Sequence, residues 1–184
     1  MYEVELKVRV DHDTVRKQLD EIGAQRIDTV TQEDVYYDAP DRDFAATDEA
    51  LRIRTVTADE TETRLTYKGP LVETQSKTRR EAETAVADPE EIRTILDGLG
   101  YEPAATVRKQ REQYTVDGCT VTLDAVDGLG EFVEAELEIE DGIDDARNRL
   151  ESVFERLGLD PADQIRTSYL GLLLAEEDTD QATT

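Results

Sequence analysis

The amino end of the chain alternates charged and apolar residues in a pattern that could bind both metal ions and phosphate. Glu3, Glu5 and Lys7 are each separated from the next by one apolar residue, and Arg9 continues the alternation. A period of two is typical of a β-strand that turns its charged side chains to one face. Carboxylates bind divalent cations, and lysine and arginine grip phosphate oxygens. Such a face is therefore suited to metal-assisted phosphate chemistry.

The same alternation recurs along the chain, which argues against a single surface strand. It appears in six further segments, residues 51–54, 64–68, 79–83, 107–111, 120–124 and 132–139. Strands of this kind can form an open sheet whose charged face is solvated. They can also form a closed sheet that turns its charged face inward around a polar ligand and packs helices outside.

A polyphosphate with a bound divalent cation would satisfy both signs of charge in such an interior. Basic side chains would neutralise the phosphates, while the acids would need cations between them and the ligand. The chain has one cysteine, Cys119, and one histidine, His12, so the ligands left are oxygens, which favour Mg²⁺ or Mn²⁺. The reaction class that follows is metal-assisted phosphoryl chemistry. The sequence contains no P-loop or other glycine-rich nucleotide motif.

The composition is strongly acidic. The formal net charge is −24, from 45 acidic and 21 basic residues. Diffuse acidity of this size disfavours binding to nucleic acid through its phosphates. A regularly patterned chain that is acidic, poor in lysine and rich in threonine is predicted to be halophilic, because strong salt would screen its self-repulsion. Against this background, basic residues that gather on strand faces are expected to have a specific role.

The chain is predicted to form one domain without membrane segments. Its 184 residues suit a single hydrophobic core, and no apolar run has the length of a membrane span. The first predicted strand begins at residue 2, so we expect no signal peptide and a cytoplasmic location. A single cysteine excludes an intramolecular disulfide.

Helical periodicity between the strands predicts the elements that would cover a sheet. We expect helices near residues 13–22, 89–98, 144–157 and 162–175. Each of the first three follows a strand that contains Glu-x-Glu and ends near a glycine, which forms a weak internal repeat. Residues 38–48 and 69–77 are predicted loops. Residues 176–184 are predicted to be a polar, frayed tail.

The ordered set of motifs resembles the CYTH superfamily, also called triphosphate tunnel metalloenzymes. The matching segments are Glu3-x-Glu5-x-Lys7, residues 51–54, 68–70, 79–81 and 109–111, and the run from residue 124 to residue 136. The resemblance covers about residues 2–174. It implies an α+β fold, a closed eight-stranded antiparallel β-barrel with a charged interior and helices packed outside. We expect a single CYTH domain over residues 1–175, followed by the tail.

The resemblance also implies roles for individual side chains. Mg²⁺ or Mn²⁺ would be held by Glu3, Glu5, Asp124, Glu134 and Glu136. The triphosphate would be gripped by Lys7, Arg52, Arg54, Lys68, Arg79, Lys109 and Arg111, of which Lys7, Lys109 and Arg111 would act in catalysis. Two further acids, Glu81 and Glu83, would orient the bases or help with the metal.

Other polar and aromatic residues are expected to have structural roles. Arg9, Arg64 and Glu138 are as well explained by charges at a barrel end or on the surface. Core or rim packing is favoured over a base pocket for three tyrosines, Tyr36, Tyr37 and Tyr67. Tyr169 is expected to pack its helix on the barrel.

Within the superfamily, the chain is most similar to class IV adenylate cyclases. The similarity lies in residues 2–7, 68–70, 99–101, 109–111, 128–130 and 166–169. It implies conversion of ATP to 3′,5′-cyclic AMP and pyrophosphate. Two alternatives stay open, namely hydrolysis of an inorganic, nucleoside or thiamine triphosphate and a non-enzymatic sensor of polyphosphate or nucleotide. A homodimer is a further expectation from the resemblance.

Overall fold

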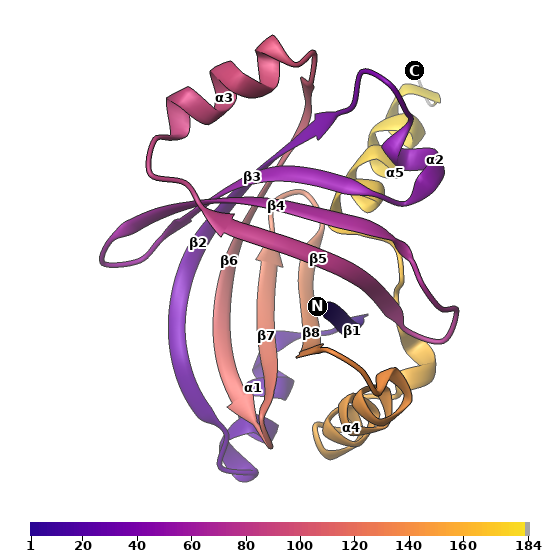
Figure 1. Ribbon diagram of the computed structural model, residues 1–184. Coiled ribbons are helices and arrows are strands. Elements are labelled where there is room, and N and C mark those ends of the chain that lie inside the picture. The colour runs from indigo at the N-terminus through magenta and orange to yellow at the C-terminus, as the bar shows by residue number, and fades with distance from the viewer. Residues whose placement is uncertain (183–184) are drawn as a thin grey trace.

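Eight strands of the protein form a closed barrel with helices outside it (Figure 1). This computed structural model describes residues 1–182, and the side chains of residues 1–176. The elements in chain order are β1 (Tyr2–Arg9), α1 (His12–Glu21), β2 (Gln25–Asp38), α2 (Phe44–Thr47), β3 (Ala50–Thr57), β4 (Thr61–Leu71), β5 (Lys77–Ala85), α3 (Pro89–Gly98), β6 (Glu102–Val116), β7 (Cys119–Val126), β8 (Gly130–Ile139), α4 (Ile143–Arg156), a 3-10 turn (Pro161–Asp163) and α5 (Tyr169–Ala182).

The barrel confirms the predicted fold class. Its strands follow the order β1-β5-β4-β3-β2-β6-β7-β8, and every neighbouring pair is antiparallel. β1 closes the sheet, because it pairs with β8 from Tyr2 to Arg9 and with β5 from Tyr2 to Glu5. The last strand of the chain and a strand from its middle are thus joined through the first.

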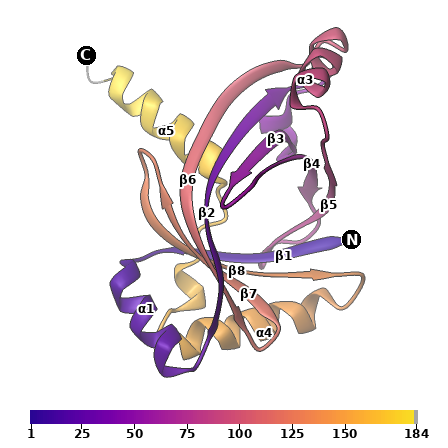
Figure 2. The same cartoon turned by 90° about the vertical axis from the view of Figure 1, so that its left-hand side faces the viewer.

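The outer face of β1 and β8 is apolar and is covered by α1 and α4 (Figure 2). Val4 and Leu6 alternate with the charged residues of β1 and pack with Val15, Leu150 and Phe154 of the two helices. This burial stabilises the helices because their apolar residues recur on one face. The predicted helices near residues 13–22, 89–98 and 144–157 are confirmed as α1, α3 and α4.

The other two long helices cover different parts of the barrel: α3 packs on β2, β3 and β4, and α5 packs beside the ends of β6, β7 and β8. Leu96 of α3 packs with Tyr37, Phe44 and Ile53, and Tyr169 of α5 packs with Phe132. Asp88 caps α3, since its carboxylate accepts hydrogen bonds from the first amides of the helix. Within residues 1–182, no helix combines the length and hydrophobicity that a membrane span requires.

The last predicted helix is wrong at its start. Residues 161–163 form a 3-10 turn, and α5 begins only at Tyr169. The intervening segment is bound to β1 instead of coiling, because the Ile165 amide donates to the Lys7 carbonyl at 2.6 Å. The Ser168 hydroxyl then accepts from the Gly171 amide in the first turn of α5.

α5 continues to Ala182, so the chain is helical through residues predicted to be a frayed tail. The domain boundary at residue 175 stays a prediction. The predicted loop at residues 38–48 contains the short helix α2. The predicted loop at residues 69–77 is shorter than expected, because β4 extends to Leu71.

Removal of the Phe154 ring tests the packing of α4 on the barrel. Phe154 is fully buried, so we expect Phe154→Ala to lower the free energy of unfolding by about 3–5 kcal/mol. The measurement is equilibrium denaturation by urea. Glu155→Ala, at an exposed position of the same helix, is the control and should change the free energy by less than about 0.5 kcal/mol. A similar small effect of both substitutions would contradict this account of the core.

Candidate active site

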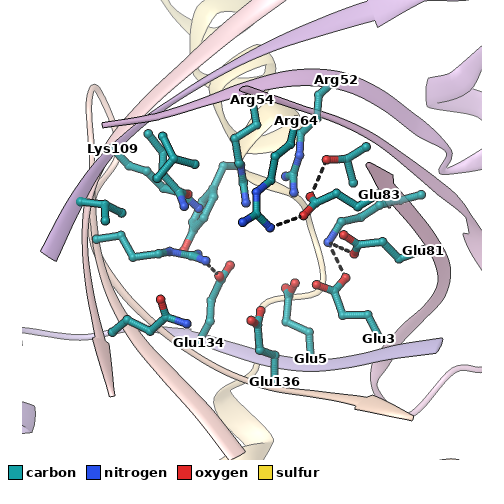
Figure 3. Close-up of a pocket in the computed structure, with 18 of the residues that line it drawn as sticks. Glu3, Glu5, Arg52, Arg54, Arg64, Glu81, Glu83, Lys109, Glu134 and Glu136 are labelled. Carbon is teal, nitrogen blue, oxygen red and sulfur yellow. Dashed lines mark hydrogen bonds and ion pairs between the residues drawn. The ribbon is translucent and has the colours of Figure 1, made fainter. Parts of the chain in front are cut away.

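The barrel encloses a charged cavity of about 560 Å³ (Figure 3). Nine of the 21 basic residues of the chain line it, namely Lys7, Arg52, Arg54, Arg64, Lys68, Lys77, Arg79, Lys109 and Arg111. Eleven acidic residues line it as well. A chain with a net charge of −24 therefore places a nearly balanced set of charges inside its barrel. This concentration of bases confirms that the charged strand faces point inward.

All the predicted site residues except Asp124 line this cavity. Figure 3 shows Glu3, Glu5, Glu134 and Glu136 on the wall formed by β1 and β8, and arginines on the opposite wall. The pairing of β1 with β8 explains the acidic wall, because it places Glu5 opposite Glu136. The metal and phosphate roles of these residues stay predictions.

Asp124 lies behind the cavity wall and holds two bases in place. It is fully buried. Arg111 donates to its Oδ1 and Oδ2 at 2.7 and 2.5 Å, and the Lys109 ammonium donates to Oδ2 at 3.0 Å. The Tyr169 hydroxyl also donates to Oδ2, at 3.0 Å. Both carboxylate oxygens thus already accept hydrogen bonds from the protein, unlike the Oε1 atom of Glu5.

The acidic wall carries carboxylates that lack full compensation. The Glu5 Oε1 atom is buried and has no hydrogen-bond donor. Burial, together with the charges of Glu3 and Glu134, raises the pKa of Glu136 to about 7. Among residues 1–182, however, no three side chains of the kinds that bind metals already converge as a complete metal site. The wall is therefore rich in donor oxygens without being a preformed cage.

Lys68 links the acidic wall to the glutamates of β5. Its ammonium donates to Glu3 and lies 2.9 Å from a carboxylate oxygen of Glu81. Burial opposes ionisation of Glu3, but the charge and hydrogen bond of Lys68 prevail and lower the pKa of Glu3 to about 2. Glu3 therefore remains an anion at neutral pH.

Two residues of this charge network were missed from the sequence. Asp34 of β2 accepts from Arg54 at 2.6 and 2.7 Å and lies 3.5 Å from Arg52. Lys77 lies 3.5 Å from Glu5, and burial lowers its pKa to about 8. The alternation of residues along β5 could have identified Lys77, because it lies two residues before Arg79 and therefore on the same face of the strand. It could have found Asp34 as well, had residues 25–38 been included among the alternating strands.

Tyr169 contributes to the cavity in addition to packing its helix. Its ring lies 4.3 Å from the Lys7 ammonium and 4.8 Å from that of Lys109, measured to the ring centroid. The Lys7 ammonium also donates to the Thr167 carbonyl at 2.7 Å. Ser168 and Tyr169 both line the cavity, and the start of α5 lies behind it in the close-up (Figure 3). The carboxyl-terminal segment thus closes one end of the barrel.

The opposite end of the barrel has an acidic rim. Asp59 and Glu60 lie in the turn after β3, whereas Ala50, at the start of β3, packs near Tyr169. Since the two ends of one strand lie at opposite ends of the barrel, the turn is at the end away from Tyr169. Asp28 and Glu62 also line the cavity. A ligand that enters here meets carboxylates before it meets the lysines.

The remaining sequence predictions divide between the inside and the outside of the barrel. Arg64, Glu138 and Tyr36 line the cavity. Arg9 lies outside, where its guanidinium donates to the Leu129 carbonyl at 2.8 Å and stacks on Phe132. Tyr37 and Tyr67 pack in the hydrophobic cluster between α3 and the barrel, as expected for core packing.

Comparison with known proteins identifies the family to which the chain belongs. The model of the CYTH domain matches residues 1–169. The chain belongs to the CYTH domain family. Its barrel and inward-facing charges are the expected features of that family, so the fold and the family agree.

The CYTH relatives resemble the chain over nearly its whole length. A Methanocaldococcus jannaschii protein named "Putative adenylate cyclase" is 40% identical over 176 residues, which are 94% of this chain and 98% of the relative. "Adenylate cyclase CyaB" of Aeromonas hydrophila is 30% identical, over 91% of this chain and 86% of the relative. The solved structure of the PH1819 protein from Pyrococcus horikoshii is 41% identical, with a TM-score of 0.87, and covers 95% of this chain and 99% of that one.

The buried pair of Asp34 with Arg54 predicts a pH-dependent loss of stability. The neighbouring arginines outweigh the effect of burial and hold the pKa of Asp34 well below its usual range. We expect Asp34→Asn to lower the free energy of unfolding by about 3 kcal/mol at neutral pH, because the buried guanidinium of Arg52 and the partly buried one of Arg54 lose their partner. A carboxylate with a depressed folded-state pKa stabilises the protein above its unfolded pKa of about 3.9 and loses this effect as the pH falls.

Urea denaturation of the wild type and Asp34→Asn at several pH values checks this prediction. The difference between them should be largest near neutral pH and should shrink below about pH 4. Asp38→Asn, at an exposed position at the end of the same strand, is the control and should stay within about 0.5 kcal/mol of wild type. A difference that does not depend on pH would contradict the assignment.

Proposed function

We propose that the protein is a metal-dependent phosphoryl-transfer enzyme that acts on a triphosphate inside the barrel. We propose further that its reaction is the conversion of ATP to 3′,5′-cyclic AMP and pyrophosphate. The observation that carries the proposal is the cavity itself, in which nine bases surround a ligand space that also has a wall of incompletely compensated carboxylates. The adenylate cyclase names of two relatives that match most of the chain support the choice of reaction.

The bases suit a linear chain of phosphates. They are distributed over β1 and β3–β6, so they surround the cavity and do not form a single patch. Arginines would bind phosphate oxygens through two donors, and lysines would act as point charges. Burial and the nearby charge of Arg111 lower the pKa of Lys109 to about 8. A bound polyanion would favour the charged form of this lysine, so the site gains a cation as the ligand arrives.

The acidic wall fits a divalent cation that is shared with the substrate. Its donors are all carboxylate oxygens, which suits Mg²⁺ or Mn²⁺. Glu5 presents an oxygen without a donor, and Glu136 is crowded by other acids. Mg²⁺ commonly takes only one or two carboxylates and completes its shell with water and substrate phosphates. The lack of a complete cage among the described residues is consistent with that mode of binding.

In this proposal, the acids of β1 and β8 and the bases have separate tasks. Glu3, Glu5, Glu134 and Glu136 would hold the metal, which when bound stabilises negative charge on phosphate oxygens. Asp124 would orient Arg111 and Lys109 toward the phosphates, because its oxygens are already occupied by those bases.

The cyclisation forms one bond and breaks another. The ribose 3′-oxygen attacks the α-phosphorus, and the bond from that phosphorus to the oxygen that bridges to the β-phosphate breaks. The 3′-hydroxyl proton passes to a carboxylate of the acidic wall, and pyrophosphate leaves within reach of the bases.

Hydrolysis of a triphosphate is the second candidate. It is favoured by the charged lining of the cavity, in which polyphosphate alone could make every contact with the bases. Water would then attack the terminal phosphorus in the same charged surroundings.

Product analysis separates these reactions. Purified protein is incubated with ATP or tripolyphosphate, with Mg²⁺ or Mn²⁺, in low and high salt. We expect cyclic AMP and pyrophosphate from ATP, and no product after a chelator removes the metal. Orthophosphate as the main product would establish the hydrolase, and tight binding without turnover would establish a sensor. Activity that persists in excess chelator would contradict the dependence on metal.

Glu5→Gln tests the acidic wall. We expect turnover to fall by roughly 100-fold or more, as is found when a group that stabilises transition-state charge is removed. Glu33→Gln removes the same charge from the outer side of β2, where Glu33 accepts from Arg108 at 2.7 Å, and should leave turnover unchanged. Normal turnover of Glu5→Gln at low metal concentration would overturn the assignment of Glu5.

A further inference from the structure

The ammonium group of Lys7 is held mainly by neutral groups. It donates to the Thr167 carbonyl at 2.7 Å and lies 4.3 Å from the centroid of the Tyr169 ring. Among the described residues, its closest carboxylate oxygens belong to Glu5 and Glu134 and are 4.0 Å away. That separation is too long for a hydrogen bond. A backbone carbonyl and a ring face therefore fix the position of this buried cation.

Other bases of the cavity are held by carboxylates at hydrogen-bond distance. Arg54 donates to Asp34 at 2.6 Å, and Arg111 donates to Asp124 at 2.7 Å. Such a pair fixes the base, but a phosphate that approaches it has to compete with the carboxylate. A ring face attracts a cation through its quadrupole and carries no net charge. The contacts of Lys7 therefore hold the side chain while leaving its charge to attract a ligand.

The backbone of Lys7 is anchored by the same segment of the chain. The Ile165 amide donates to the Lys7 carbonyl at 2.6 Å, in addition to the contacts of the ammonium with Thr167 and Tyr169. Every second residue from 165 to 169 thus contacts Lys7. The position of this lysine consequently depends on the segment that leads into α5.

Tyr169 is itself fixed at its ring and at its hydroxyl. Its ring packs edge-on against Phe132, with 5.1 Å between the centroids, and its hydroxyl donates to Asp124 at 3.0 Å. Burial, together with the charges of Glu134 and Asp124, raises the pKa of Tyr169 well above its usual range. The hydroxyl therefore keeps its proton and remains a donor. The ring is a rigid surface, and rigidity matters because a misplacement of about 1 Å can cost roughly 100-fold in rate.

The same ring also contacts a second lysine. The Lys109 ammonium lies 4.8 Å from the ring centroid and donates to Asp124, the carboxylate that also accepts from the Tyr169 hydroxyl. Lys7 is on β1 and Lys109 is on β6, and these strands are not neighbours in the barrel. One side chain thus fixes two cations relative to each other across the sheet.

We propose that Tyr169 is a positioning residue, whose ring holds the ammonium groups of Lys7 and Lys109 in place for the ligand without neutralising Lys7. The inference rests on the proposed binding of a triphosphate in the barrel, and it adds a residue through which two of the bases are oriented. Tyr169 acts through these lysines in this proposal and does not take part in the bond changes.

Titration calorimetry of the full chain with tripolyphosphate and Mg²⁺ tests the proposal. We expect Tyr169→Leu to weaken binding at least about tenfold, because the contact between a ring and desolvated cations is lost. Tyr169→Phe keeps the ring and should bind within about threefold of wild type. Wild-type affinity of Tyr169→Leu, or equal losses for both variants, would overturn the role of the ring.

Tyr37→Leu is the matched control. Tyr37 is about as buried as Tyr169 and packs in the cluster beneath α3. The substitution removes the same ring from the hydrophobic core and should leave tripolyphosphate affinity as in wild type. A loss as large as that of Tyr169→Leu would assign the effect to core packing and overturn the proposal.

A change in the charge of the ring face separates positioning from packing. Pentafluorophenylalanine at position 169 is close in shape to the phenylalanine of Tyr169→Phe, but its fluorines reverse the quadrupole of the ring. We expect the fluorinated ring to weaken tripolyphosphate binding at least about tenfold relative to Tyr169→Phe. The difference should shrink when Lys7→Met removes one of the cations. Equal affinity with the two rings would overturn the proposal, and this pair decides the matter if Tyr169→Leu does not fold.

The experiments also distinguish this proposal from the proposed function. Wild type that binds tripolyphosphate with an affinity insensitive to the ring at position 169 would overturn the positioning role alone. Failure of the wild type to bind tripolyphosphate would instead overturn the proposed function, and the positioning role with it.

Discussion

Closure of the sheet through β1 is the constraint on which the rest of the structure depends. β1 pairs with β8 along its length and with β5 at its start, so its charged face has to point into an enclosed space. Removing an ion from water costs several kcal/mol unless a partner compensates it. The interior therefore has to supply both signs of charge. It does so through pairs between neighbouring strands, such as Arg54 with Asp34 and Arg111 with Asp124.

The compensation is incomplete, and the imbalance is what a ligand can use. Two buried lysines, Lys77 and Lys109, have pKa values lowered to about 8, mainly because burial disfavours their charge. Glu136 shows the opposite shift, to about 7, for the same reason. Both signs of charge are thus partly suppressed in the cavity. A polyanion would stabilise the lysines, and a cation would stabilise the acids, so a metal-bound triphosphate complements the interior in both respects.

The outer layer of the molecule has a separate role. α1 and α4 bury the apolar face of β1 and β8, α3 covers β2, β3 and β4, and α5 packs beside the ends of β6, β7 and β8. These contacts are hydrophobic and place no demand on the charges inside. The exception is the segment at the start of α5, where Ser168 and Tyr169 line the cavity and Tyr169 donates to Asp124. This segment closes one end of the barrel. Packing and site are therefore joined at this segment.

The sequence by itself determined which residues face inward. In a strand, alternation is a local property, so Glu3, Glu5 and Lys7 share a face whatever the strand pairs with. The recurrence of the pattern, together with the resemblance to the CYTH superfamily, was sufficient to predict the closed barrel and most of the residues that line its cavity. Helix periodicity was likewise sufficient for α1, α3 and α4.

Only the tertiary structure decided how the inward charges are paired. That Asp124 holds Arg111, and that Asp34 holds Arg54, depends on the register of strands that meet after the chain has turned. The late start of α5 depends on a hydrogen bond from Ile165 to β1, more than 150 residues away in sequence. Pairing and register are set by contacts between distant segments, and local periodicity carries no information about them.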